Sequence, residues 1–169
     1  EARIVGSDRG VFVDDVNPDT FDARKAAAGP ELGVPIPVAQ DVAALGRRAR
    51  WATVYVVEDA GGLQRIIFPI YGKGMWSMLS GFLALESDLN TIAGIVFNEQ
   101  GETAGIGDRI LAPDWQARWQ GRKLYDAQDT LRFRIAKAAV DPGAPGAVFE
   151  VDGLTGATVT ADAVTNLVR

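Results

Sequence analysis

The chain reads Trp-Ala-Thr-Val-Tyr-Val-Val-Glu at 51–58 and Gln-Arg-Ile-Ile-Phe-Pro-Ile-Tyr at 64–71, with Asp-Ala-Gly-Gly at 59–62 between the two runs. Runs of this length, rich in β-branched and aromatic residues and separated by a glycine-containing turn, are typical of a β-hairpin. A second pair of runs occupies 80–87 and 91–98, separated by Asp-Leu-Asn. Two successive hairpins predict an antiparallel sheet.

Short helices and irregular segments are predicted before this sheet. Asn17 followed by Pro18 is typical of a helix start, and the segment continues to Ala28 before Gly-Pro ends it. The prolines at 31–37 predict an extended loop, and 41–50 is predicted to form a second short helix.

The part of the chain that follows the second hairpin is expected to mix helices and strands. Trp115 and Trp119 lie four residues apart after a proline, which places both on one face of a short helix. Two more strands are predicted at 131–138 and 147–151, and a final helix covers 159–168. The fold class is therefore α+β, with an antiparallel sheet of hairpins packed with short helices in a single domain over 1–169.

Composition excludes several kinds of partner. The 169 residues include 17 Lys and Arg against 22 Asp and Glu, a net charge of -5, and no basic run alternates with aromatic residues. Nucleic acid is therefore not an expected partner. No apolar run approaches the roughly 20 residues that a membrane-spanning helix needs. The chain begins at Glu1 without an initiator Met, which indicates a processed product or an engineered fragment.

Histidine and cysteine are both absent. This excludes thiol catalysis, histidine-based triads and metal sites built from those two residues. Carboxylate or lysine chemistry, an all-oxygen metal site, or an organic cofactor that brings its own reactivity remain open. No catalytic residue and no metal ligand set can be singled out.

The segment 152–158 reads Asp-Gly-Leu-Thr-Gly-Ala-Thr and runs directly into the predicted final helix. Backbone N–H donors, two hydroxyls and the positive end of a helix dipole in one place suit a phosphate. An alternative interpretation is a simple turn and N-cap, with Thr158 or Thr160 as the capping residue and Asp162 complementing the dipole.

Two further glycine-containing segments follow predicted strands. At 71–77, Tyr-Gly-Lys-Gly-Met-Trp-Ser, the glycines let the backbone approach a flat ligand that Trp76 could cover. The alternative is a tight connection with Trp76 in the core, which these residues alone favour.

The second of these segments, 101–108, reads Gly-Glu-Thr-Ala-Gly-Ile-Gly-Asp. Glu102 and Thr103 offer polar contacts, and Ile106 suits the face of a ring. A glycine-rich turn between a strand and a helix is an equally good interpretation. No Gly-Lys-[Ser/Thr] follows, so the segment is not a Walker phosphate loop.

Together these segments resemble a known family. The residues at 152–158 match D-x-x-[ST]-G-A-T, the attachment signature of proteins that carry FMN covalently. More widely, the chain resembles the C subunit of the sodium-translocating NADH:quinone reductase, from about the first predicted helix onward. Five ordered blocks carry this resemblance: 70–77, 89–95, 101–107, 113–126 and 151–160.

The resemblance implies a function and a location. It implies an FMN domain that faces the periplasm, is tethered to the inner membrane by one N-terminal helix, and passes single electrons within a multi-subunit, ion-pumping complex. It also implies two kinds of partner: the other membrane subunits of that reductase, and a flavin transferase that installs the flavin from FAD with Mg²⁺. The isolated domain would be a redox carrier without turnover of its own.

The resemblance also implies site residues. Thr158 is the phosphoester acceptor, and Asp152 belongs to the signature that the transferase recognises. The remaining expected contacts with the covalently bound FMN come from all three segments: Thr155, Gly156, Ala157, Glu102, Thr103, Ile106, Gly107, Lys73, Trp76 and Ser77.

The chain departs from the family pattern in three respects. The N-terminal membrane helix is missing, Ala104 replaces the usual proline, and the chain stops at Arg169, where the family normally continues. Two alternatives stay open. The chain could be the G subunit of the related Rnf electron-transport complex, or a flavin-free extracytoplasmic binding or scaffold domain.

Overall fold

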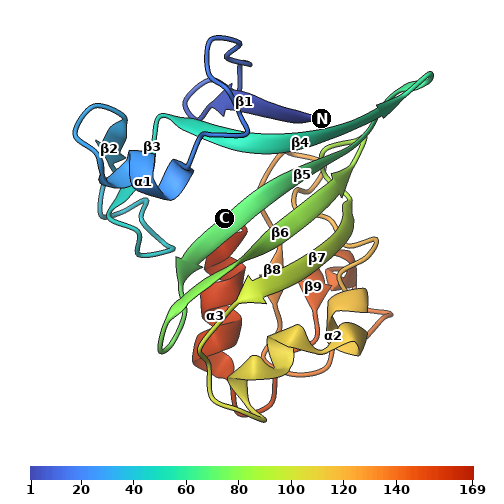
Figure 1. Ribbon diagram of the computed structural model, residues 1–169. Helices are drawn as coiled ribbons and strands as arrows, with labels where there is room; N and C mark the ends of the chain where they lie inside the picture. The colour runs from blue at the N-terminus through green and yellow to red at the C-terminus, as the bar shows by residue number, and fades with distance from the viewer.

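Both predicted hairpins are present in the computed structural model, which describes residues 1–169 (Figure 1). They form the centre of a five-stranded antiparallel sheet in the order β1-β4-β5-β6-β7. The strands are β1 (Ala2–Gly6), β4 (Trp51–Asp59), β5 (Gly62–Lys73), β6 (Met78–Glu86) and β7 (Ile92–Glu99). The α+β fold class is confirmed. Strand β1 was not predicted from the sequence, because its partner β4 lies some 50 residues further along the chain.

One position shows how closely the two strands of the second hairpin approach each other. A Cβ atom on Gly81 of β6 would lie 2.0 Å from the carbonyl oxygen of Val96 on β7, and the register shifts between Ser80 and Gly81. Only glycine fits there. By contrast, a Cβ atom on Gly94 of β7 would meet nothing within 4 Å.

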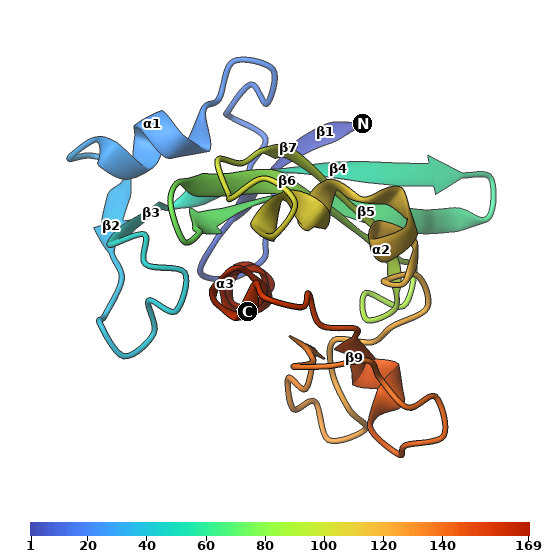
Figure 2. The ribbon, with the colours of Figure 1, turned by 90° about the horizontal axis from the view of Figure 1, so that it is seen from below.

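The hydrophobic core lies on the face of the sheet that α3 (Thr158–Leu167) covers (Figure 2). Trp115 of α2 (Pro113–Ala117) and Trp119 just beyond it pack edge to face, with ring centroids 5.5 Å apart. Trp119 also contacts Phe133, at 4.8 Å between centroids, and its indole N–H is buried without a hydrogen-bond partner. The predicted final helix is confirmed. The two tryptophans pack together, but α2 ends at Ala117, so Trp119 lies in the turn after the helix and not on the predicted helix face.

The opposite face of the sheet carries a small N-terminal layer. It consists of α1 (Ala23–Ala28) and the antiparallel pair β2 (Gly33–Pro35) and β3 (Arg47–Ala49). Figure 2 shows α1 and α3 on opposite sides of the sheet. The Arg47 guanidinium holds the layer together by donating hydrogen bonds to three backbone carbonyls, those of Ala27 (3.0 Å), Gly29 (3.3 Å) and Gly33 (2.8 Å).

The helix predicted to start at Asn17 was placed too early. The side chain of Asn17 accepts a hydrogen bond from the N–H of Asp19 at 2.9 Å, which forms a local turn rather than a helix cap. The helix begins at Ala23, because Asp22 accepts hydrogen bonds from the N–H groups of Arg24 and Lys25.

The helix predicted at 41–50 was wrong. The Asp41 carboxylate accepts hydrogen bonds from the N–H groups of Leu45 (2.8 Å) and Gly46 (2.7 Å), and this closes a turn. Ala44 and Gly46 take positive φ angles of 53° and 71°, which a helix cannot contain. The chain then enters β3.

The strands predicted at 131–138 and 147–151 were too long. Only β8 (Arg134–Ile135) and β9 (Glu150–Val151) form, and they pair in parallel. Around them the backbone bonds to other partners: Phe133 donates to the carbonyl of Leu124, and 147–149 form a short 3₁₀ turn. No helix of the chain combines the length and the apolar character needed to cross a membrane.

Candidate functional site

The structure brings the loop after β5 and the loop after β7 together. The backbone N–H of Trp76 donates to Oε1 of Glu102 at 3.1 Å, and the indole N–H of Trp76 donates to the hydroxyl of Thr103 at 3.1 Å. Ser77 lies against the same loop, since a Cβ atom on Gly101 would be 2.9 Å from the Ser77 hydroxyl. Trp76 is 67% exposed, so the interpretation that places it in the core was wrong.

The N-terminus of α3 joins the same cluster. The Thr160 hydroxyl donates to Oε2 of Glu102 at 2.5 Å, across 58 residues of sequence. A Cβ atom on Gly156 would lie 3.8 Å from Cγ2 of Ile106, and Gly156 has a φ of 81° that favours glycine. The three glycine-containing segments of the sequence therefore form one surface.

Glu102 is the buried centre of this surface. It is only 7% exposed, and no Lys or Arg forms an ion pair with it. Two glycines make room for it: a Cβ atom on Gly74 would lie 2.7 Å from Oε1, and one on Gly107 would lie 2.8 Å from its Cβ. A carboxylate in this position connects the two loops to the helix.

Thr158 is the exposed first residue of α3, and no side chain caps this helix. The N–H groups of Thr158, Val159 and Thr160 have no acceptor within the chain; the first helical bond runs from Ala161 to Ala157. The N-cap interpretation of Thr158 or Thr160 was wrong, because Thr160 turns inward to Glu102. Asp162 does not lie in the first turn, so its predicted role at the dipole was wrong as well.

Exposed apolar and hydroxyl groups flank this helix end. Ile106 is 42% exposed, and Thr103 and Thr155 are also exposed, while Ala157 is buried. A flat apolar ligand could lie against Trp76 and Ile106 while an anionic group on it reaches the free N–H groups of α3. The surface thus combines an apolar part with an anion-binding part.

Lys73 is less closely tied to the cluster. It is the exposed last residue of β5, its backbone N–H donates to the carbonyl of Ala43 at 3.0 Å, and its side chain makes no hydrogen bond or ion pair. The Ser77 hydroxyl donates to the carbonyl of its neighbour Met78 at 3.2 Å. Neither side chain bonds to Glu102 or to α3.

Asp152 holds segments together beside the site. Its carboxylate accepts the N–H of Val140 at 2.7 Å and pairs with Arg118, while its carbonyl accepts the indole N–H of Trp115 at 2.9 Å. The hydrogen bond from Val140, and then the Arg118 guanidinium, keep the pKa of Asp152 below its ordinary value against the opposing effect of burial. Asp152 therefore has a structural role in the folded chain.

The contact between Thr160 and Glu102 was not predicted from the sequence. A signal for it exists, because helical periodicity places Thr160 on the same face as the buried Val164. A hydroxyl on an apolar face needs a hydrogen-bond partner, but the sequence does not show which residue provides it.

The model of the FMN-binding domain family matches residues 74–169, which include the whole cluster except Lys73. The chain belongs to the FMN-binding domain family. It is 47% identical over 168 residues to the C subunit of the Na(+)-translocating NADH-quinone reductase of Pseudomonas aeruginosa, covering 99% of this chain and 64% of that protein. The corresponding protein of Vibrio vulnificus is 41% identical, with 97% and 63% covered. The chain thus spans slightly less than two thirds of these curated relatives.

Solved structures of this family agree with the fold. The crystal structure of Shewanella oneidensis NqrC superposes with a TM-score of 0.90 at 37% identity, covering 99% of this chain and 76% of that one. The C subunit of the Na(+)-translocating NADH-quinone reductase from Parabacteroides distasonis gives a TM-score of 0.72 at 27% identity, with 99% and 71% covered. The resemblance that the five sequence blocks indicated is confirmed.

Proposed function

We propose that this chain is the flavin-carrying domain of a sodium-translocating NADH:quinone reductase, with FMN attached to Thr158 through a phosphoester. One observation carries the proposal: an uncapped helix end, with an exposed Thr158 hydroxyl and three free N–H groups, lies beside the Trp76 and Ile106 surface. The family match and the relatives from NADH-quinone reductases support it.

The phosphate would be held by the start of α3. The free N–H groups of Thr158, Val159 and Thr160 would donate to its oxygens, and the helix dipole would stabilise its negative charge. Gly156 permits the positive φ that turns the chain into the helix, and Thr155 adds a second exposed hydroxyl. Ala157 anchors this turn in the core.

The flavin ring would be held by the two loops. Trp76 and Ile106 would contact its apolar faces, and Thr103 fixes the indole of Trp76. Glu102 and Gly107 set the spacing between the loops and α3. Lys73 and Ser77 would lie at the edge of the flavin site. FMN, when bound, supplies the electron-transfer chemistry, so the chain needs no acid, base or nucleophile of its own.

The location and partners belong to the same proposal. The domain would face the periplasm at the inner membrane and exchange electrons with the other subunits of the complex. A flavin transferase would install FMN after recognising the signature that contains Asp152. A covalent bond would prevent loss of the flavin in a compartment where free FMN is not replenished.

Intact mass spectrometry tests the attachment site. After co-expression with a flavin transferase, the chain should gain the mass of FMN less one water, and a denatured gel band should fluoresce under ultraviolet light. Thr158→Val should remain folded and gain no mass, while the control Thr155→Ser, which keeps the attachment signature, should still gain it. Gel-stable flavin on Thr158→Val, or an unmodified parent chain after exposure to the transferase, would refute the proposal.

A further inference from the structure

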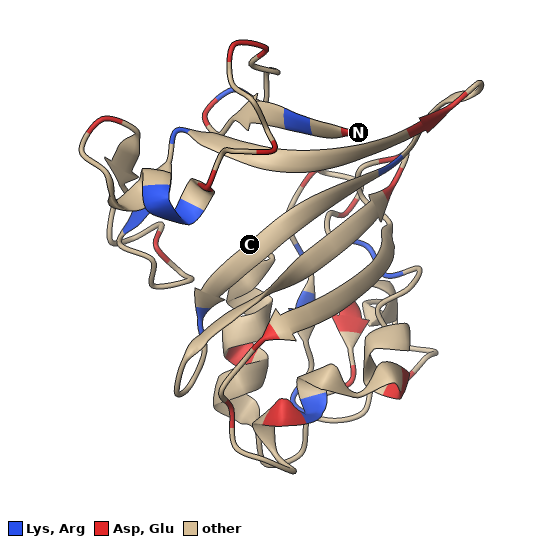
Figure 3. Ribbon diagram, viewed as in Figure 1, with Lys and Arg blue, Asp and Glu red and all other residues tan.

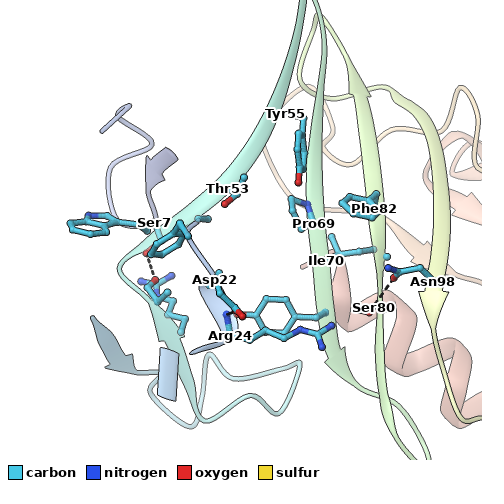
Figure 4. A pocket seen from close by; sticks show the side chains of 18 residues that line it. Ser7, Asp22, Arg24, Thr53, Tyr55, Pro69, Ile70, Ser80, Phe82 and Asn98 are labelled. Carbon is cyan, nitrogen blue, oxygen red and sulfur yellow. Dashed lines mark hydrogen bonds between the residues drawn. The ribbon is translucent and has the colours of Figure 1, made fainter. Parts of the chain in front are cut away.

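A sizeable cavity lies away from the proposed flavin site. It has a volume of about 570 Å³ and lies between α1 and the face of the sheet opposite α3 (Figure 4). Asp22 and Arg24 lie on one side of it, and Tyr55, Pro69 and Phe82 on the other. The volume is within the range of pockets that bind small organic molecules.

Aromatic side chains form much of the cavity wall. Phe21 and Trp51 pack with ring centroids 6.1 Å apart, and Tyr55 and Phe82 meet edge to face at 6.1 Å. The ring of Tyr71 lies 5.4 Å from the guanidinium of Arg24. Rings held in this way offer flat surfaces on which another ring can stack.

The charges at the cavity leave one cation without a partner. Asp22 is occupied, because its carboxylate caps α1, and Arg24 pairs with Glu99 at 3.0 Å. Arg48, from β3, forms no ion pair and no side-chain hydrogen bond. Figure 3 shows Lys and Arg residues on α1 and on the strand beside it, whereas the middle parts of β5, β6 and β7 carry no charge. The cavity therefore presents one free positive charge.

Unpaired hydroxyl groups also face the cavity. Thr53, Tyr55 and Tyr71 line it, and none of their hydroxyls makes a hydrogen bond within the chain. The Tyr71 phenol can donate as well, since a phenol is protonated at neutral pH and burial raises its pKa further. The Ser80 hydroxyl, by contrast, is already bonded to Asn98 and Glu99.

We infer that this cavity binds a small, flat aromatic molecule with one negative charge. Its ring lies among Trp51, Tyr55 and Phe82, and its anionic group pairs with the Arg48 guanidinium, whose planar donors suit a carboxylate or sulfonate. The hydroxyls of Thr53 and Tyr55 serve as further donors. This site lies on the other side of the sheet from α3 and does not depend on flavin attachment.

Isothermal titration of the chain with naphthalene-2-sulfonate tests the inference. The parent chain should show saturable binding at one site. Arg48→Gln, at an exposed and unpaired residue, should weaken binding about tenfold, as expected for one charge-assisted hydrogen bond. Thr53→Trp, which fills the cavity, should abolish binding.

Three controls separate this site from nonspecific binding. Val96→Ser, on the same sheet face but outside the cavity, should bind as the parent does, and so should Thr158→Val. The neutral analogue naphthalene-2-methanol should bind at least tenfold more weakly than the sulfonate. The inference would be overturned if the sulfonate showed no saturable binding, or if the sulfonate and the neutral analogue bound with equal affinity. It would also be overturned if both Arg48→Gln and Thr53→Trp bound the sulfonate as tightly as the parent chain does.

Discussion

Replacing Glu102 tests whether one buried carboxylate holds the site together. In Glu102→Ala the hydroxyl of Thr160, which is 2% exposed, and the N–H of Trp76 both lose their acceptor. Each loss costs about 1–3 kcal/mol, whereas removing a desolvated charge with no ion pair offsets part of the sum. We expect a net loss of about 2 kcal/mol in the free energy of unfolding, or about 4–8 °C in Tm for a chain of this length.

Urea denaturation followed by circular dichroism measures this loss, and a double-mutant cycle isolates the contact. Glu102→Gln keeps an acceptor for Trp76 and should cost less than about 1 kcal/mol. Thr160→Val alone should cost about 2 kcal/mol, and the double variant Glu102→Ala with Thr160→Val should cost at least 1 kcal/mol less than the sum of the single losses. Additivity within about 0.5 kcal/mol would show that the two residues do not depend on each other, and would refute the reasoning.

Three further predictions concern the fold. Gly81→Ala should lower the free energy of unfolding by more than about 3 kcal/mol, because its Cβ would lie 2.0 Å from the Val96 carbonyl oxygen. The control Gly94→Ala should change the free energy of unfolding by less than about 0.5 kcal/mol, because its Cβ would meet nothing within 4 Å. Equal melting temperatures of the two variants would contradict this. The pKa of Asp152 is lowered by folding, so its contribution to stability is present above its ordinary value of 3.8 and is lost as the pH falls through the folded value. Asp152→Asn should therefore reduce the pH dependence of the unfolding free energy below about pH 4, and an unchanged pH dependence there would argue against this role. Trp115→Phe should cost about 1 kcal/mol more than Trp119→Phe, because only Trp115 loses an indole hydrogen bond; the reverse order in thermal denaturation would count against this explanation.

The sequence predicted best where neighbouring residues determine the structure. The hairpins at 51–71 and 80–98 were found because their turns are short, and the final helix was found from its apolar period. The N-terminal layer was predicted poorly. Asn and Asp are residue types that often cap the start of a helix, but their side chains also accept hydrogen bonds from nearby N–H groups in turns. Asn17 and Asp41 do the latter.

The candidate site, too, was predicted from the sequence only as far as neighbouring residues determine it. Its segments could be recognised from glycines and hydroxyls, and the family resemblance assigned their roles. The contacts between segments could not be predicted, because Trp76 and Thr103 are 27 residues apart and Glu102 and Thr160 are 58 apart. Strand β1 shows the same limit, since its pairing with β4 depends on the folded sheet rather than on its own five residues.

The hydrogen bonds of Arg47 have a consequence for the N-terminal layer. The apolar residues buried in this layer are two alanines, Ala27 and Ala49, so little apolar surface keeps it in place. One guanidinium instead supports the end of α1 and the start of β2. We therefore expect residues 23–49 to exchange their amide hydrogens as one cooperative unit, through openings that leave the five-stranded sheet intact.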